Sequence, residues 1–187
     1  MQLQLPIPKE RILQLAQQVD QASINLLTKA IIDINSDDQY LIKLAELNGF
    51  IYKPKPIKVY VDSYGGHVYQ CLGLLGVMDN SIVPIHTIVT GCAMSCGFLI
   101  AVAGHERYAY DKATFMYHQV STGFEGKIKD MDEDFIETKR LQKIIETHTL
   151  SKTKLTKKQL TDNYNAKKDW YINTKDALKY KIIDKII

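Results

Sequence analysis

Apolar residues recur along this chain with two different spacings, and the two spacings alternate. Over 57–61 every second residue is apolar, which is typical of a strand with one buried face. Between Ile24 and Ile34 apolar residues return after three or four positions, which is typical of a helix with one apolar face. Asp20 precedes that run and is a suitable N-cap. The continued alternation predicts an α/β fold with a parallel sheet built from crossover units.

The same spacings and the turn residues between them place the other elements. Residues 36–38, Ser-Asp-Asp, are expected to end the first helix, and a short helical segment is expected to end at Gly49. Residues 11–15 fit a strand or a helix by periodicity alone. The predicted helices are 20–34, 41–47, 67–78, 96–104, 128–148, 156–166 and 174–180, and the predicted strands are 57–61, 82–89, 106–110, 113–117 and 181–187.

The predicted helix over 128–148 is polar on most of its faces. Its apolar residues form a sparse stripe of Met131, Phe135, Ile144 and Ile145. A polar helix of this length is unstable alone unless it packs on a partner. We therefore expect the stripe to be buried against another subunit.

Length and composition indicate one globular domain of ordinary type. The chain has 187 residues with 45% hydrophobic and 24% charged residues, and no apolar run approaches the ~20 residues that cross a bilayer. Residues 1–10 lack the pattern of a signal peptide. The three cysteines, Cys71, Cys92 and Cys96, form no zinc-like array. Their odd number predicts no disulfide framework and a reducing compartment, the cytoplasm or its equivalent in an organelle.

The net charge of +3 is unevenly distributed. Residues 151–187 contain ten lysines and four aspartates, a balance of +6, so the rest of the chain has a balance of −3. A basic segment of this kind could contact nucleic acid. Because it has no arginine to support base contact, we interpret it as a solvated helical face.

One serine lies at a point where a strand-like run changes into a helix-like run. Ser95 is bracketed by Gly91 and Gly97, and a run of small apolar residues follows it. Glycines permit sharp backbone turns, and a helix N-terminus favours negative charge. This layout fits a catalytic nucleophile, although the Gly-x-Ser-x-Gly spacing is not met. On these features alone a simple turn before a buried helix is the preferred interpretation, because short Gly/Ser motifs arise often by chance.

Four motifs in a fixed order make the chain resemble the ClpP family, the proteolytic subunit of the Clp proteases. They are Gly-Cys-Ala-Met-Ser-Cys-Gly at 91–97, Met-Tyr-His-Gln at 116–119, Asp-Ser-Tyr-Gly-Gly at 62–66 and Lys-Asp-Trp-Tyr at 168–171. The resemblance runs from about residue 9 to the C-terminus and is specific because separate motifs agree. It implies the ββα spiral of the ClpP and crotonase folds in a single domain, 1–187. It also implies a short strand at 11–15, a hairpin over 106–117 and a protruding handle helix over 128–148.

The resemblance also implies the roles of five residues. Ser95 corresponds to the nucleophile, His118 to the general base and Asp169 to the acid that orients the base. The backbone N–H groups of Gly66 and Cys96 correspond to the oxyanion hole.

Two alternatives to these roles arise from the residues. His67 follows the Gly-Gly turn and is a rival base, but it has no counterpart in the motif. Cys96 is a rival nucleophile, because a helix N-terminus lowers a thiol pKa. Its position in the motif assigns its backbone to the oxyanion hole and its side chain elsewhere.

By this resemblance the chain is a serine endopeptidase that hydrolyses unfolded polypeptides. The substrate would pair as a strand beside residues 66–68 and 121–126. The partners implied are further copies in a ring, as two stacked heptamers, and an AAA+ unfoldase of the Clp type. No metal or bound cofactor is implied, and ATP would act only through the partner ATPase. The alternatives are a non-catalytic ring subunit and a crotonase-type acyl-CoA enzyme.

The chain departs from the family pattern at several points. Val120 replaces a proline, Lys168 an arginine and Lys181 a glycine. Residues 41–56 make the chain roughly a dozen residues longer there, enough for one extra helical element. Residues 1–8 are too short for the segment that lines the axial pore of the family. The resemblance therefore implies an open pore that admits loosely folded chains without ATP.

Overall fold

The long strand β3 (Ile85–Met94) is the centre of the sheet in the computed structural model, which describes residues 10–123 and 125–187. β3 pairs in parallel with β2 (Ile57–Ser63) on one side. On its other side its first half pairs with β4 (Glu106–Ala109) and its second half with β5 (Thr114–Tyr117), both in parallel. The remaining strands of the described sheet are β1 (Ile12–Leu15) beside β2, β7 (Lys185–Ile186) beside β4, and β6 (Trp170–Asn173), which is antiparallel to β5.

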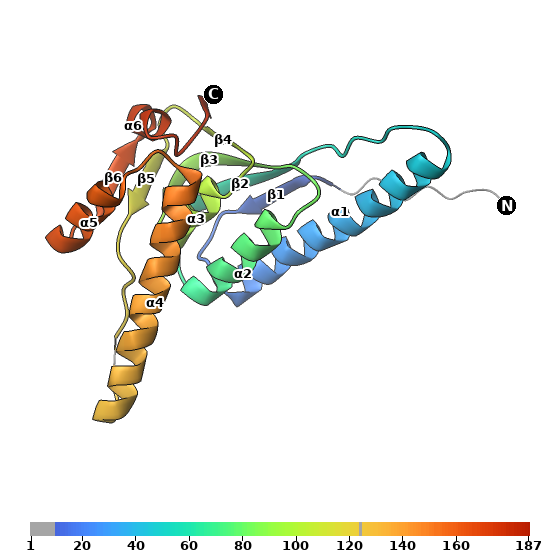
Figure 1. Ribbon diagram of the computed structural model, residues 1–187. Coiled ribbons are helices and arrows are strands. Elements are labelled where there is room, and N and C mark those ends of the chain that lie inside the picture. The colour runs from blue at the N-terminus through green and yellow to red at the C-terminus, as the bar shows by residue number, and fades with distance from the viewer. Residues whose placement is uncertain (1–9, 124) are drawn as a thin grey trace.

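Helices pack around this sheet and one of them projects from it (Figure 1). The helices are α1 (Gln21–Leu47), α2 (Val68–Asp79), α3 (Cys96–Val102), α4 (Ile128–Lys152), α5 (Lys157–Ala166) and α6 (Thr174–Lys179). α1 and α2 run side by side, and α3 packs on β3 with all seven of its residues buried. The α/β fold with a predominantly parallel sheet is thus confirmed.

The predicted hairpin over 106–117 is wrong. β4 and β5 do not pair with each other, because both pair with β3 at successive positions. Between them the chain turns through Tyr110, whose N–H donates to Val89 O at 2.9 Å, while Ala113 N–H donates to Tyr110 O at 3.0 Å. The turn carries the chain forward along β3 instead of reversing it.

The predicted end of the first helix at 36–38 is also wrong. α1 begins where expected, with Asp20 as N-cap in a reciprocal pair of hydrogen bonds with Ser23. It then continues without a break to Leu47. Asp38 lies within the helix and is fully buried. Both terminal nitrogens of Arg11 donate to its carboxylate at 2.7 Å, which compensates for the burial of its charge.

The segment between α1 and β2 is also bound to this ion pair. The Tyr52 hydroxyl donates to Asp38 Oδ1 at 2.7 Å, and Arg11 also donates to Lys55 O at 2.9 Å. Burial alone would raise the pKa of Asp38, but the hydrogen bonds from Arg11 and Tyr52 outweigh burial and hold the pKa below its usual range. The extra length at 41–56 therefore extends α1 and then covers this buried ion pair.

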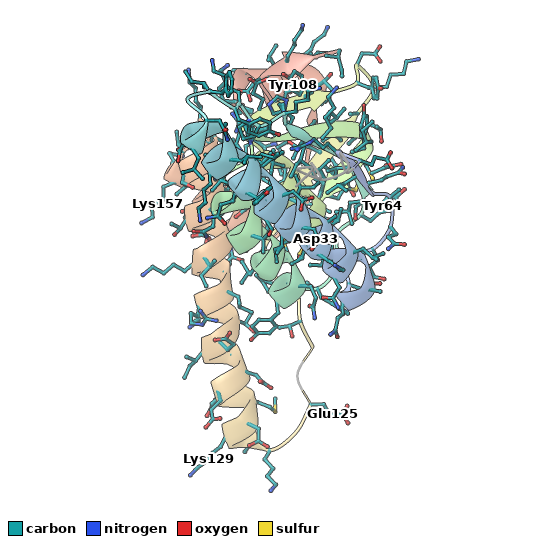
Figure 2. All side chains as sticks on the ribbon, turned by 90° about the vertical axis from the view of Figure 1, so that its right-hand side faces the viewer. Asp33, Tyr64, Tyr108, Glu125, Lys129 and Lys157 are labelled. Atoms are coloured by element: carbon teal, nitrogen blue, oxygen red, sulfur yellow. The ribbon has the colours of Figure 1, made fainter. Side chains whose placement is uncertain are left out.

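α4 is buried only along its C-terminal half. Its buried residues are Leu141, Ile145 and Thr149, whereas Met131 and Phe135 of the predicted stripe are exposed. The first turns project away from the body, with Lys129 at the far end (Figure 2). None of the helices in the described ranges is long and apolar enough to span a membrane.

Other predicted bounds changed less. β7 is shorter than the predicted strand 181–187, since Lys181 has a positive φ of 56° and the N–H groups of Ile182 and Ile183 donate to Ala177 O at the end of α6. β6 was not predicted, and residues 1–8, on which the open-pore expectation rests, lie outside the described residues.

The buried ion pair predicts a specific pH dependence. Because the folded-state pKa of Asp38 is depressed, its stabilising contribution is present above the unfolded pKa of ~3.9 and is lost as the pH falls through the folded value. Asp38→Asn should lower the free energy of unfolding near neutral pH by about 3 kcal/mol. It should also flatten the decline of stability in acid, as measured by urea unfolding at a fixed protein concentration.

Asp162→Asn is the matched control. Asp162 pairs with Lys158 at 2.7 Å on the exposed side of α5, so its loss should change stability by less than about 1 kcal/mol. An acid decline in Asp38→Asn as steep as in the wild type would contradict the role of the pair.

Candidate active site

Ser95 has an unusual backbone conformation at the junction of β3 and α3. Its φ is 51° and its ψ is −121°, although it carries a side chain. Its N–H donates to Met116 O at 2.9 Å, which ties the junction to β5. Backbone conformations of this kind cost free energy and concentrate at functional sites. The predicted sharp turn at this serine is confirmed.

A glycine loop packs directly against the serine turn. A Cβ on Gly65 would lie 2.7 Å from both Ser95 Cβ and Met94 O, and one on Gly97 would lie 2.7 Å from Ser63 O. The loop is held from behind by Val19, whose N–H donates to Gly65 O at 2.8 Å. The close approach of the loop and the turn therefore requires glycine at both positions.

Ser95 and His118 line the same small cavity, of about 100 Å³. The register of β3 and β5 explains this, because Met94 is opposite Met116. Ser95 directly follows Met94, and His118 comes two residues after Met116. The cavity is bounded on other sides by Leu99 of α3 and Ile145 of α4. The structure thus brings the predicted nucleophile and the predicted base to one place.

Asp169 lies on the other side of His118. Both residues line an adjoining cavity of about 440 Å³. Asp169 directly precedes β6, whose first residue, Trp170, is opposite Tyr117. Among the described side chains, however, no hydrogen bond joins His118 to Ser95 or to Asp169. The three residues thus line two cavities that share His118, but they are not hydrogen-bonded to one another.

The two predicted oxyanion donors also line the Ser95 cavity. Cys96 is the first residue of α3, so its N–H has no partner within the helix. Gly66 has a φ of 152°, and a Cβ there would lie 2.3 Å from Val19 O. Both N–H groups therefore belong to backbone that the surrounding structure fixes.

The two rival residues are placed differently. His67 is the N-cap residue of α2 and lines a neighbouring groove instead of the Ser95 cavity. The Cys96 thiol is 2% exposed and donates to Gly66 O at 3.2 Å. The neighbouring Cys71 thiol lowers the pKa of Cys96, against the effect of burial. The lower pKa by itself would favour a reactive thiolate, but this side chain is enclosed and cannot reach a substrate. A buried thiol engaged with the backbone is a poor candidate nucleophile.

Gln142 of α4 is a residue that sequence reasoning missed. Its side-chain oxygen accepts the Val120 N–H at 2.8 Å, and its nitrogen donates to Glu146 at 2.8 Å. This links the chain just after His118 to α4. The sequence did contain a signal for this contact, namely valine instead of proline at position 120. Valine has a backbone N–H that can donate, and proline has none.

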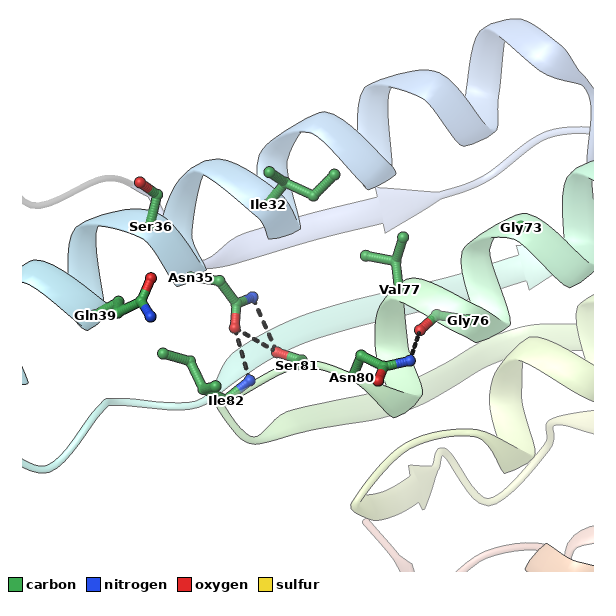
Figure 3. A pocket seen from close by; sticks show the side chains of 10 residues that line it. All are labelled: Ile32, Asn35, Ser36, Gln39, Gly73, Gly76, Val77, Asn80, Ser81 and Ile82. Atoms are coloured by element: carbon green, nitrogen blue, oxygen red, sulfur yellow. Dashed lines mark hydrogen bonds between the residues drawn. The ribbon is translucent and has the colours of Figure 1, made fainter.

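A larger hollow elsewhere does not belong to this site. It has a volume of about 610 Å³ and lies between α1 and α2 (Figure 3). Asn35 in its wall accepts the Ile82 N–H at 2.7 Å and bonds Ser81, so it fixes the turn before β3. Within the described ranges, no group of three or more histidine, cysteine, aspartate or glutamate side chains could hold a metal ion.

A serine at a strained strand-to-helix turn, with a histidine in its cavity and helix N–H groups beside it, is the arrangement of serine hydrolases. A family model described as Clp protease matches residues 2–187. The chain therefore belongs to the Clp protease family.

Individual relatives share this family name. The chain is 31% identical over 133 residues to an ATP-dependent Clp protease proteolytic subunit from Deinococcus radiodurans. The matched region covers 70% of this chain and 64% of that protein. Proteins of the same name from Porphyromonas gingivalis and Dehalococcoides mccartyi are 27% and 26% identical over 95% and 96% of this chain. The matched part spans 74% and 82% of those two proteins.

The packing of the glycine loop predicts a contrast between two glycines. Gly65→Ala forces a Cβ against the serine turn at a φ of 98° and should destabilise the protein by about 2 kcal/mol or more. Gly73→Ala places a Cβ in α2 with no atom within 4 Å and should stabilise by up to ~1 kcal/mol. Thermal unfolding followed by circular dichroism measures both, and equal midpoints would contradict the packing argument.

Proposed function

We propose that this chain is a serine endopeptidase, the proteolytic subunit of a Clp-type protease. The observation that carries the proposal is the cavity shared by Ser95, His118, Gly66 and Cys96. It combines a candidate nucleophile, a base and two backbone N–H groups within one small volume. Membership of the Clp protease family makes peptide-bond hydrolysis the reaction to test first.

In the proposed mechanism Ser95 Oγ attacks the carbonyl carbon of the scissile peptide. His118 takes the serine proton and then gives it to the leaving amine, while Asp169 orients the imidazole and stabilises its charged form. The N–H groups of Gly66 and Cys96 hold the oxyanion of the tetrahedral intermediate. Water then releases the acyl group by the reverse sequence.

The missing hydrogen bonds around His118 are compatible with this mechanism. Catalytic hydrogen bonds are often long in the absence of substrate and tighten in the complex. Phe135 and Lys139 of α4 line the same cavity as His118 and Asp169. We infer that packing of α4 against another subunit brings these groups closer.

The proposed substrate is an extended polypeptide. A groove of about 400 Å³ continues from Gly66 along α2 and is closed on its other side by residues 120–123. A strand placed there would use backbone hydrogen bonds, which accept many sequences. We therefore propose unfolded polypeptides as the substrate class.

The proposed assembly is a ring of identical subunits, as two stacked heptamers. The projecting half of α4 exposes Ile128, Met131, Phe135 and Ile136, and exposed apolar surface of this kind marks an interface. We further propose that an AAA+ unfoldase of the Clp type delivers substrate and supplies the ATP dependence. No metal or cofactor is part of the proposal, and the three free thiols fit a reducing compartment such as the cytoplasm.

A non-catalytic ring subunit is the second candidate, since no hydrogen bond in the described residues joins His118 to Ser95 or Asp169. A fluorophosphonate probe, which reacts with activated serines, separates the two candidates. We expect the wild type to be labelled and to cleave short peptides. Ser95→Ala should abolish labelling and reduce peptide hydrolysis by several orders of magnitude, because triad members act as a unit.

Cys96→Ala is the control, because it removes the rival thiol and keeps the backbone N–H. It should remain labelled. An unlabelled wild type that assembles normally would favour the non-catalytic subunit, and labelling that depends on Cys96 instead of Ser95 would refute the assigned nucleophile.

The exposed face of α4 generates a test of assembly. Phe135 is 52% exposed in the single chain, so Phe135→Glu should leave the fold intact while placing a charge at the proposed interface. We expect stacked rings to separate into single rings or smaller species in analytical ultracentrifugation. Thr147→Glu, at an exposed position of the same helix nearer the body, should leave the assembly unchanged. A wild type that sediments as an active monomer would contradict the ring.

A further inference from the structure

A side-chain hydrogen bond joins α2 to α4 at the point where the projecting half of α4 begins. The Tyr69 hydroxyl of α2 donates to Glu137 Oε1 of α4 at 2.7 Å. Residues 128–136 of α4 are all exposed, and Glu137 is the first residue of the helix that is partly buried. Among the side-chain hydrogen bonds between α4 and the body of the described chain, this one therefore lies farthest out along the helix.

Arg140 fixes the acceptor of this hydrogen bond. Its Nε and one terminal nitrogen donate to the two carboxylate oxygens of Glu137 at 2.7 Å, a two-point arrangement that sets the orientation of the carboxylate. The hydrogen bonds from Arg140 and Tyr69 lower the pKa of Glu137 to about 2, and the bond to Glu137 raises the pKa of Tyr69. Near neutral pH the carboxylate is therefore charged and the phenol is protonated, as this hydrogen bond requires.

Both partners of the bond line the groove proposed for the substrate strand. One wall of this groove is the start of α2 with Gly66 before it, and the other wall is residues 120–123. The second wall is also bound to α4, because the Gln142 side chain accepts the Val120 N–H at 2.8 Å. α4 is thus hydrogen-bonded to both walls, and the Tyr69 hydroxyl supplies the connection on the α2 side.

We propose that Tyr69 is a positioning residue, whose hydrogen bond to Glu137 holds the two walls of the groove at the separation that one extended polypeptide strand needs. Tyr69 is not part of the wall of the Ser95 cavity, so it acts on the binding of substrate and not on the chemical step. This inference rests on the proposed peptidase function and names a residue that governs the binding of long substrates.

The connection matters most for a substrate that fills the groove. Such a strand pairs with both walls, and a wall that has to be ordered on binding lowers the affinity. A short peptide reaches only the Ser95 cavity, where Val19 holds the glycine loop through a hydrogen bond to Gly65 O at 2.8 Å, independently of α4. Loss of the Tyr69 hydroxyl should therefore weaken the binding of long peptides more than that of short ones.

The test compares two fluorogenic peptides with the same residues around the scissile bond, one short and one extended at both ends to about ten residues, roughly 33 Å of strand. In Tyr69→Phe the ratio of kcat/KM for the long peptide to that for the short peptide should fall about fivefold, the loss expected for one intramolecular hydrogen bond. The fall should come from a higher KM for the long peptide. A merely structural role would lower the activity toward both peptides and leave the ratio unchanged.

Tyr40→Phe is the matched control. It removes a hydroxyl of similar exposure, 51% for Tyr40 against 59% for Tyr69, from α1 and outside the groove, and should leave the ratio unchanged. Glu137→Ala removes the acceptor of the same hydrogen bond and should lower the ratio as well. Combining Tyr69→Phe with Glu137→Ala should lower the ratio little further than Glu137→Ala alone, because the two residues act through one interaction.

The outcomes separate this inference from the proposed function. An equal ratio in wild type and Tyr69→Phe, or fully additive effects of the two substitutions, would overturn the role of Tyr69 and leave the peptidase standing. No cleavage of either peptide by the wild type, together with no probe labelling of Ser95, would overturn both.

Discussion

The site depends on the way one strand pairs with two successive partners. β3 changes from β4 to β5 at Gly91, where a Cβ would lie 2.6 Å from the Asp62 carboxylate. That carboxylate accepts the Cys92 N–H at 2.9 Å and so occupies the space that a side chain at Gly91 would need. Because β5 then runs beside the end of β3, the residues after both strands, Ser95 and His118, reach the same cavity. Without this change of partner the two would be separated.

A second constraint acts from the opposite side of the serine turn. The loop before α2 approaches the turn so closely that glycine is required, and Val19 holds the loop through hydrogen bonds to Gly65 O and from the His67 N–H. The Ser63 hydroxyl adds a bond to Gln17 O at 2.5 Å. The unusual backbone of Ser95 is therefore fixed by two segments that are distant in sequence. This is how a fold can maintain a locally unfavourable conformation.

The sequence indicated those features whose cause is local. Glycines and a change of apolar spacing predicted the turn at Ser95, and the resemblance supplied His118 and Asp169. The missed features have distant causes. The polar residues at 36–38 predicted a helix end, because nothing near them in the sequence reveals that Arg11, 27 residues before Asp38, binds its carboxylate inside the fold. The hairpin was predicted wrongly because periodicity does not reveal which strands pair.

α4 connects these parts of the molecule through its unequal burial. Its inner half contacts α3, where His148 Nε2 lies 3.2 Å from Leu99 O, and Ile145 forms part of the Ser95 cavity. Further out along the helix, Gln142 and Phe135 line the cavity that His118 shares with Asp169. A force on the exposed outer half would therefore reach both cavities through one rigid element. The surface proposed for assembly and parts of the walls of both cavities are in this way on the same helix, so the proposed assembly would act on the surroundings of His118 through α4.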